Sequence, residues 1–156
     1  MRFFLTGLLI APILVYGGET YHGKVIGVTD GDTLTLLLEP ENRQIKVRLA
    51  GIDTPERGQP WASKARRALS DLAYGKEVRV VHVDIDRYSR RVGRVYVGDT
   101  DVNAELIREG HAWVYRKYVT EDKLFALEKK AKAGKRGLWA LPEAQIPPWD
   151  WRKGIR

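Results

Sequence analysis

Three strand-forming runs follow one another with very short connections near the start of the chain, and this pattern constrains the fold more than any other. Residues 24–29, 33–39 and 45–50 are rich in β-branched and aliphatic side chains. Turn-forming residues separate them, at positions 30–32 and 40–42. Strand runs joined by turns this short are typical of hairpins. The sequence therefore predicts a three-stranded meander.

The apolar residues change their spacing after this meander. Residues 61–74 and 120–133 repeat apolar side chains at helical spacing, and residues 102–109 form a short helical segment between a capping aspartate and a glycine. Residues 77–85 and 92–97 again have the pattern of strands. Five strands with a helix inserted after the third are typical of a small closed β-barrel of the oligonucleotide/oligosaccharide-binding (OB) type. The sequence thus predicts an α+β fold, a five-stranded OB-fold β-barrel with three α-helices.

Both ends of the chain differ in character from the middle. Residues 1–17 have a basic start at Arg2, an apolar centre and a small residue, Gly17, at their end. The apolar run is shorter than the roughly 20 residues of a membrane span, which favours a cleaved secretory signal over an anchor. A buried N-terminal helix is the alternative. Residues 142–156 have no period and are predicted to form an irregular tail, which leaves one OB-fold domain at 18–141.

The charge of the chain indicates what it binds. The net charge is +7, and Arg2 is the only charged residue of the predicted signal, so the exported protein would carry +6. A basic protein of this kind favours a polyanionic partner, either nucleic acid or an anionic membrane surface. The chain contains no cysteine, which excludes disulfides, thiolate zinc sites and cysteine nucleophiles. We expect an exported monomer, periplasmic or extracellular, with no stable membrane insertion after signal cleavage.

Two acidic turns stand at the ends of the meander strands. Asp30 and Asp32 lie between the first two strand runs, and Asp53 follows the third. A meander could bring Asp32 and Asp53 to the same end of the barrel, where a backbone carbonyl near Thr54 would add a third oxygen. Oxygen-only ligands suit calcium or magnesium rather than zinc or copper. For Asp30, a hydrogen bond to its own turn is as good an explanation as a position beside the metal.

A second group of residues beside these acids suits phosphodiester chemistry. Glu56 follows Pro55, which stiffens the turn, and could act as a general base or orient an attacking water molecule. Arg48 could bind a phosphate bidentately and stabilise the charge that develops in the transition state. A second arginine from the polar hairpin at residues 86–91 would complete the clamp. The alternatives are a solvated acid and exposed surface ion pairs.

Four stretches of the sequence stand in the order and spacing of a known family. They read VTDGDT at 28–33, VRL and IDTPE within 47–56, DRYSR at 86–90, and VNAELIREG at 102–110. In these stretches, which extend over nearly all of residues 21–140, the chain resembles the thermonuclease (staphylococcal nuclease-like) family. The resemblance implies an OB barrel that cleaves DNA and RNA with calcium, by attack on the 5′ P–O side that leaves 3′-phosphorylated products. It also implies that Asp32, Asp53 and the carbonyl of Thr54 are calcium ligands, with Asp30 near the metal.

The same resemblance assigns the catalytic groups. It implies that Glu56 is the base or water-orienting acid and that Arg48 and Arg90 are the phosphate-binding pair. The hairpin departs from the family at Ser89, where a glycine is usual, so the turn could present Arg91 instead of Arg90.

The residues expected to contact bases also depart from the family. The tyrosine-rich platform of the best-known members appears here as Arg116 and Tyr118, and Tyr88 in the hairpin is a further candidate for contact with nucleic acid. A tyrosine ring and a planar guanidinium can both stack on bases. The competing hypothesis is a non-catalytic OB-fold nucleic-acid-binding protein of the cell envelope. It explains the charge and the aromatic residues but gives the acids and arginines no role.

Overall fold

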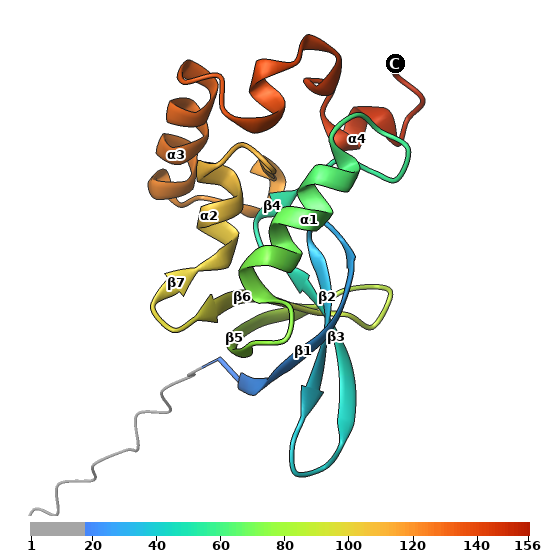
Figure 1. The fold of residues 1–156 in the computed structure, drawn as a ribbon, viewed down its shortest axis with the longest axis vertical. Coiled ribbons are helices and arrows are strands. Elements are labelled where there is room, and N and C mark those ends of the chain that lie inside the picture. Colours follow the sequence, from blue (N-terminus) through green and yellow to red (C-terminus); the bar gives the residue numbers. More distant parts are fainter. Residues whose placement is uncertain (1–17) are drawn as a thin grey trace, which may run out of the picture.

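The computed structural model describes residues 18–156, so the predicted signal at residues 1–17 lies outside the described residues (Figure 1). Five strands build the barrel: β1 (Thr20–Asp30), β2 (Thr33–Leu38), β3 (Arg43–Leu49), β5 (Glu77–Ile85) and β6 (Arg91–Val97). They follow the order β3-β2-β1-β5-β6 with antiparallel pairing, and a parallel pairing of β3 with β6 closes the sheet. The predicted meander and five-stranded barrel are therefore confirmed.

The closing contact brings together two segments that are far apart in the sequence. Arg48 of β3 is paired with Val92 of β6, immediately after the polar hairpin. Asn103 fixes this seam, because its buried side chain accepts a hydrogen bond from the backbone N–H of Val95 and donates to the carbonyls of Ala50 (2.9 Å) and of Gly93 in β6. The seam matters for function because it places Arg48 and the hairpin at the same end of the barrel.

Three helices accompany the barrel, and the sequence predicts all three; the first two pack on strands β1 and β6, and the third packs mainly on the second helix. They are α1 (Ala62–Ala73), α2 (Val102–Arg108) and α3 (Asp122–Ala133). Helix α1 buries Ala65, Leu69 and Ala73, which lie one helical turn apart. The side chain of Asp101 caps α2 by accepting a hydrogen bond from the backbone N–H of Ala104 at 3.0 Å.

Several short elements escaped prediction because two to four residues are too few to show a period. Three are two-residue strands: β4 (Ile52–Asp53) and β8 (Trp113–Val114), which pair with each other, and β7 (Thr100–Asp101), which extends the sheet beside β6. The others are the 3-10 helices η1 (Arg116–Tyr118), η2 (Gly137–Ala140) and η3 (Pro142–Ala144), and the one-turn helix α4 (Pro148–Trp151). The C-terminal segment 142–156, predicted to be irregular, therefore contains η3 and α4.

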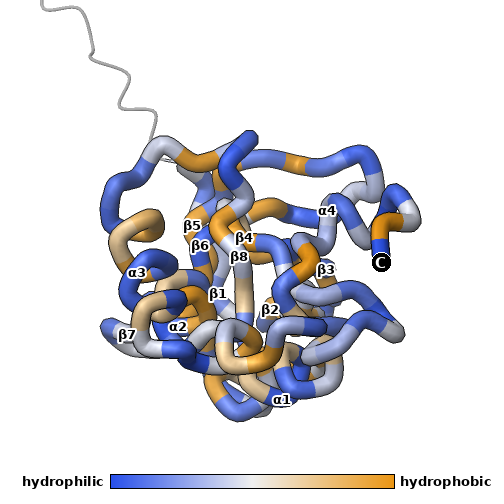
Figure 2. The backbone as a smooth tube through the Cα atoms, turned by 90° about the horizontal axis from the view of Figure 1, so that it is seen from above, coloured by the Kyte–Doolittle hydropathy of each residue, from blue (hydrophilic) through white to orange (hydrophobic). Residues whose placement is uncertain are grey.

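Two apolar clusters hold the elements together. The larger one fills the barrel and the space under α1 and α2, and Figure 2 shows apolar parts of β4, β5 and β6 in the middle of the molecule. The smaller one joins Trp113 of β8 to Trp139 and Ala144, and Trp149 of α4 packs against it. This second cluster docks the C-terminal segment onto the rest of the protein. Within residues 18–156, no helix has the length and apolar character needed to cross a membrane.

Candidate active site

Two buried carboxylates form the centre of the site. Asp32 lies in the turn between β1 and β2, Asp53 ends β4, and their exposed fractions are 5% and 2%. One guanidinium nitrogen of Arg48, Nη2, lies 3.2 Å from Asp32 Oδ2 and 3.3 Å from Asp53 Oδ1. Asp32 Oδ2 also accepts hydrogen bonds from Thr54, from its backbone N–H at 3.0 Å and its hydroxyl at 2.9 Å. The structure thus brings together four residues predicted for the site: Asp32, Arg48, Asp53 and Thr54. The first and the last of them are 22 positions apart in the sequence.

Local packing explains why the acidic turn has this shape. A Cβ at Gly31 would lie only 2.8 Å from Ala65 Cβ in α1 and from Thr54 Oγ1, so the close approach of the turn to α1 requires glycine. Asp30 Oδ1 accepts a hydrogen bond from the backbone N–H of Asp32 at 3.1 Å. This is the hydrogen bond to its own turn that the sequence predicts as one of two explanations for Asp30. Asp30 therefore stabilises its own turn while lying next to Asp32.

The acids of this cluster oppose one another electrostatically. Burial, and then the negative charge of Asp32, raise the pKa of Asp30 to about 6. Burial is also the largest cause that raises the pKa of Asp53, where the charge of Asp32 adds to the effect and the hydrogen bond from Arg152 opposes it. Carboxylates that resist ionisation for these reasons would be stabilised by a cation bound between them.

The residues present fit a hard divalent cation. Asp32, Asp53 and the carbonyl of Thr54 would give an all-oxygen set, with water completing the coordination, as calcium and magnesium prefer. In residues 18–156, no three or more His, Cys, Asp or Glu side chains are grouped as a metal cluster. The fit therefore depends on two carboxylates and a backbone carbonyl, a set suited to a cation that keeps open positions for a substrate.

Glu56 lies in the turn that follows these ligands. Its carboxylate is partly exposed, and its backbone N–H donates to Oε1 of the buried Gln59 at 2.9 Å. Gln59 thereby fixes the turn while leaving the Glu56 carboxylate at the surface of the site. A carboxylate in this position can accept a proton from water near the buried acids.

The polar hairpin presents Arg90 to the same end of the barrel. Arg90 Nη1 lies 3.3 Å from the hydroxyl oxygen of Thr33, the neighbour of Asp32, and Arg90 Nε donates to Asp86 Oδ2 at 2.7 Å. Partial burial raises the pKa of Asp86, but hydrogen bonds outweigh this effect and hold the pKa below its usual range. They come from the backbone and side chain of Arg90 and from the backbone of Tyr88. Ser89 adopts a left-handed conformation with φ of 61°, the geometry that favours glycine.

Arg91 points elsewhere. Its Nε donates to the hydroxyl of Tyr21 at 3.1 Å, at the start of β1, the end of that strand opposite to the acidic turn. The structure therefore places Arg90 rather than Arg91 beside the acids.

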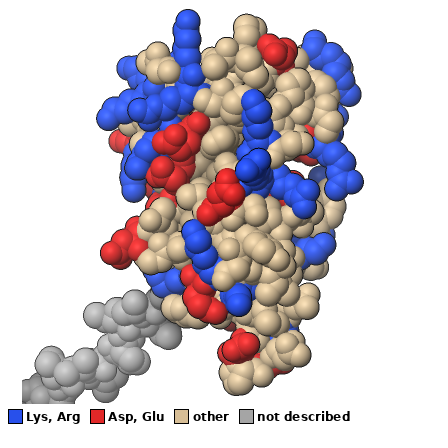
Figure 3. Space-filling model, viewed as in Figure 1, with Lys and Arg blue, Asp and Glu red and all other residues tan. Residues whose placement is uncertain are grey.

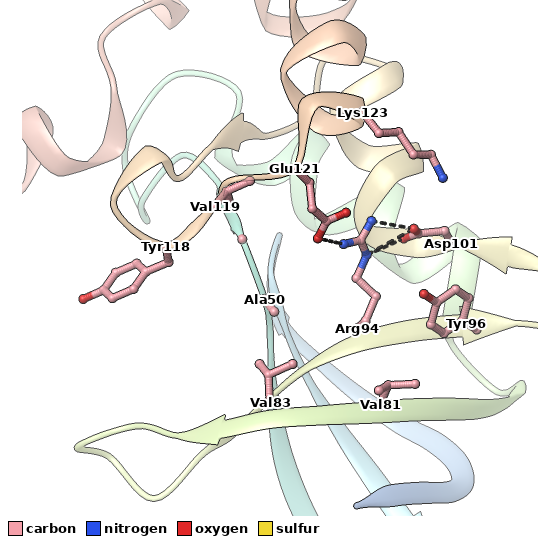
Figure 4. A pocket seen from close by; sticks show the side chains of 11 residues that line it. Ala50, Val81, Val83, Arg94, Tyr96, Asp101, Tyr118, Val119, Glu121 and Lys123 are labelled. Atoms are coloured by element: carbon pink, nitrogen blue, oxygen red, sulfur yellow. Dashed lines mark hydrogen bonds and ion pairs between the residues drawn. The ribbon is translucent and has the colours of Figure 1, made fainter. Parts of the chain in front are cut away.

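The residues expected to contact bases lie around the site rather than within it. Tyr88 and Tyr118 are both well exposed. Tyr118 borders a groove of about 520 Å³ between the barrel and the segment leading into α3, and Figure 4 shows its ring pointing away from Arg94 and the other residues of this groove. Arg116 instead forms an ion pair of 2.6 Å with the buried Glu128. The aromatic residue that Tyr118 contacts is Tyr115, with ring centroids 4.9 Å apart.

Sequence reasoning missed a third arginine. Arg152, which follows α4, places Nη2 2.8 Å from Asp53 Oδ2 and Nη1 2.5 Å from Glu56 Oε1. The only sequence signal was the mixture of tryptophans and basic residues near the C-terminus, which has no period and lies outside the resemblance.

An OB barrel with two buried carboxylates, a partly exposed glutamate and arginines at one end carries the groups that phosphodiester hydrolysis needs. Similarity to known proteins identifies the family. Residues 46–141 match the model of the family described as "Staphylococcal nuclease homologue". A Shigella flexneri protein called micrococcal nuclease is 43% identical over 148 residues, covering 87% of this chain and 83% of that protein. A Haemophilus influenzae protein called an uncharacterized endonuclease is 40% identical, covering 97% of this chain and 85% of that protein. The chain belongs to the staphylococcal nuclease family, as its motifs predict.

Proposed function

We propose that this protein is a calcium-dependent endonuclease that hydrolyses phosphodiester bonds of both DNA and RNA and leaves 3′-phosphorylated products. Family membership supports the nuclease activity. The observation that carries the cation-dependent mechanism is the guanidinium of Arg48 lying between Asp32 and Asp53. This arrangement sets a phosphate-binding group directly beside two carboxylates suited to a divalent cation.

Each residue of the site has a distinct part in this proposal. Arg48 and Arg90 bind the scissile phosphate from two sides and stabilise the charge on its equatorial oxygens as water attacks. Glu56 accepts the proton of that water or orients it. Asp32, Asp53 and the carbonyl of Thr54 would hold calcium, whose chemistry is the neutralisation of negative charge on the phosphate. No covalent intermediate with the protein is required.

Recognition through the backbone of the nucleic acid fits the surface of the protein. Lys and Arg side chains gather over α3 on the face shown in Figure 3, and the chain carries a net charge of +7. Contacts to phosphates do not distinguish bases, and the exposed rings of Tyr88 and Tyr118 can stack on any base. These features support a substrate range that includes both DNA and RNA.

The basic start, apolar centre and small-residue end of residues 1–17 support export to the periplasm or the medium. The proposal includes removal of this segment near Gly17. N-terminal sequencing of exported protein tests it: a chain that still begins at Met1 would contradict cleavage.

The activity is tested by incubating the purified protein with single- and double-stranded DNA and with RNA, in calcium, in magnesium and in excess chelator. We expect cleavage in calcium, weaker cleavage in magnesium because of its stricter octahedral demand, and none in chelator. The fragments should resist extension by a polymerase until a phosphatase removes the 3′-phosphate. Asp53→Asn should lose cleavage, whereas Asp71→Asn, a change at an exposed acid of α1, should not. Nucleic-acid binding without cleavage under all these conditions would instead identify a binding protein.

A further inference from the structure

The C-terminal segment reaches into the site that the barrel builds. Figure 1 shows α4 beside the loop that leads from β4 to α1, and Arg152 follows α4 directly. Its guanidinium spans two acids: Nη2 to Asp53 Oδ2 at 2.8 Å, and Nη1 to Glu56 Oε1 at 2.5 Å and to Asp53 Oδ1 at 3.3 Å. Arg152 therefore contacts both the best-buried acid of the site and the proposed base.

Independent contacts hold this segment in place. The ring of Trp149 is parallel to that of Tyr115, at 3° and 5.8 Å between centroids, and meets Trp113 edge-on at 5.7 Å. Gln59 Nε2 donates to the carbonyl of Ile146 at 2.6 Å, while its Oε1 accepts from the backbone of the Glu56 turn. The segment and the Glu56 turn thus share one buried anchor, so the position of Arg152 is determined by packing as well as by charge.

The contacts of Arg152 use the oxygens that a metal would need. Asp53 Oδ2 takes a hydrogen bond from Arg152, and Asp53 Oδ1 is shared between Arg152 and Arg48. Without Arg152, Asp53 Oδ2 would have no hydrogen-bond donor among the described residues. A hard cation and a guanidinium both bind through carboxylate lone pairs, and such charge-assisted bonds are among the strongest in proteins.

We propose that Arg152 is a further residue of the active site, a positioning arginine that competes with the divalent cation for Asp53 and holds Glu56 while no cation is bound. This inference rests on the proposed function, since it concerns the same cation. Cation binding must break the bond from Arg152 to Asp53 Oδ2, so the C-terminal segment weakens cation affinity. In return, the guanidinium partly neutralises the acids in the cation-free protein.

Calorimetric titration of calcium into the wild-type protein and the Arg152→Ala and Arg152→Lys variants tests this competition directly, without any activity assay. We expect Arg152→Ala to bind calcium about tenfold more tightly, because one charge-assisted contact with a partly exposed arginine no longer has to be broken. Arg152→Lys should lie between the two, since a single ammonium cannot span two acids.

Lys153→Ala is the matched control. Lys153 is the next residue, carries the same charge, is 69% exposed and has its ion-pair partner, Asp150, within the same segment at 3.6 Å. Its replacement should change calcium affinity by less than about twofold, because an exposed charge is screened by solvent and salt. A tenfold effect of Lys153→Ala would reduce the role of Arg152 to general electrostatics and overturn the proposal.

Thermal unfolding gives a second readout and shows whether each variant folds. In chelator, Arg152→Ala should melt below wild type because the acids lose a partner, and added calcium should raise its melting temperature by more than that of wild type. Equal or weaker calcium binding by a folded Arg152→Ala protein would refute the competition while leaving the calcium proposal intact. Failure of wild type and every variant to bind calcium would refute both.

Discussion

Arg90 and Arg91 are adjacent, yet the structure predicts that only Arg90 matters for turnover. The guanidinium of Arg90 lies 3.3 Å from Thr33 Oγ1, and Thr33 in turn donates to Asp32 Oδ1 at 3.2 Å. Arg91 is directed to Tyr21 instead. Loss of a single donor that stabilises transition-state charge costs about 2.7–4 kcal/mol, or roughly a hundredfold to a thousandfold in rate. We expect Arg90→Ala to lower kcat by at least about a hundredfold and Arg91→Ala to remain near wild type.

The structural cost of losing Arg90 is too small to imitate this effect. Asp86 would lose its ion-pair partner but keep hydrogen bonds from the backbone N–H groups of Tyr88 and Arg90. A partly exposed ion pair is worth about 1 kcal/mol or less, which lowers the melting temperature by a few degrees. Arg90→Lys should not restore turnover, because lysine offers a point charge instead of a planar fork of donors.

The assay measures kcat and KM on a short fluorescent oligonucleotide in calcium, with a melting curve of each variant alongside. A transition-state clamp predicts a loss mainly in kcat for Arg90→Ala. The reverse ranking, with Arg91→Ala crippled and Arg90→Ala active, would refute the assignment and move the phosphate-binding role to Arg91.

Three further predictions concern single side chains. Glu56→Gln should lower cleavage by about a hundredfold or more with little change in nucleic-acid affinity measured by a gel-shift assay; equal loss of both would make Glu56 structural. Ser89→Gly should raise the free energy of unfolding by up to about 1 kcal/mol in urea melts, because it removes left-handed strain; a loss of stability would contradict that explanation. Burial lowers the pKa of His111, whose Nδ1 accepts a hydrogen bond from Trp61 at 3.1 Å, so stability should fall as the pH drops below about 6.5. His111→Gln should flatten that dependence, and an unchanged pH profile would exclude His111 as its source.

The periodic parts of the fold could be predicted because local patterns encode them. Five strands and three helices were read from the spacing of apolar residues and the residues that end each run, and the structure confirms them. The acidic turns could also be identified, since Asp32 and Asp53 follow or precede strands that a meander places side by side. Their contacts with Thr54 and Arg48 follow from the short connections between the meander strands, because these connections leave the chain few alternative paths.

The contacts that complete the site could not be predicted because no local pattern encodes them. The parallel pairing of β3 with β6 joins residues more than 40 positions apart, and it sets the hairpin beside Arg48. Arg152 contacts Asp53 across 99 positions, and it directly follows a helix of only four residues. Its place depends on the docking of Trp149, and tryptophans in an aperiodic segment do not reveal which residues they pack against.

The clustering of acids that suits a cation should also make the cation-free protein less stable. The charge of Asp32 contributes to the raised pKa values of Asp30 and Asp53, so at neutral pH it opposes their ionised forms. Asp32→Asn keeps an acceptor for Thr54 and leaves Arg48 paired with Asp53. In chelator at pH 7.5 it should therefore raise the free energy of unfolding by about 1 kcal/mol while abolishing cleavage. The gain should shrink at pH 4.5, where the raised pKa leaves Asp30 largely protonated in the folded protein. Urea melts at both pH values test this, and a variant less stable than wild type at pH 7.5 would mean that the contacts of Asp32 outweigh the repulsion.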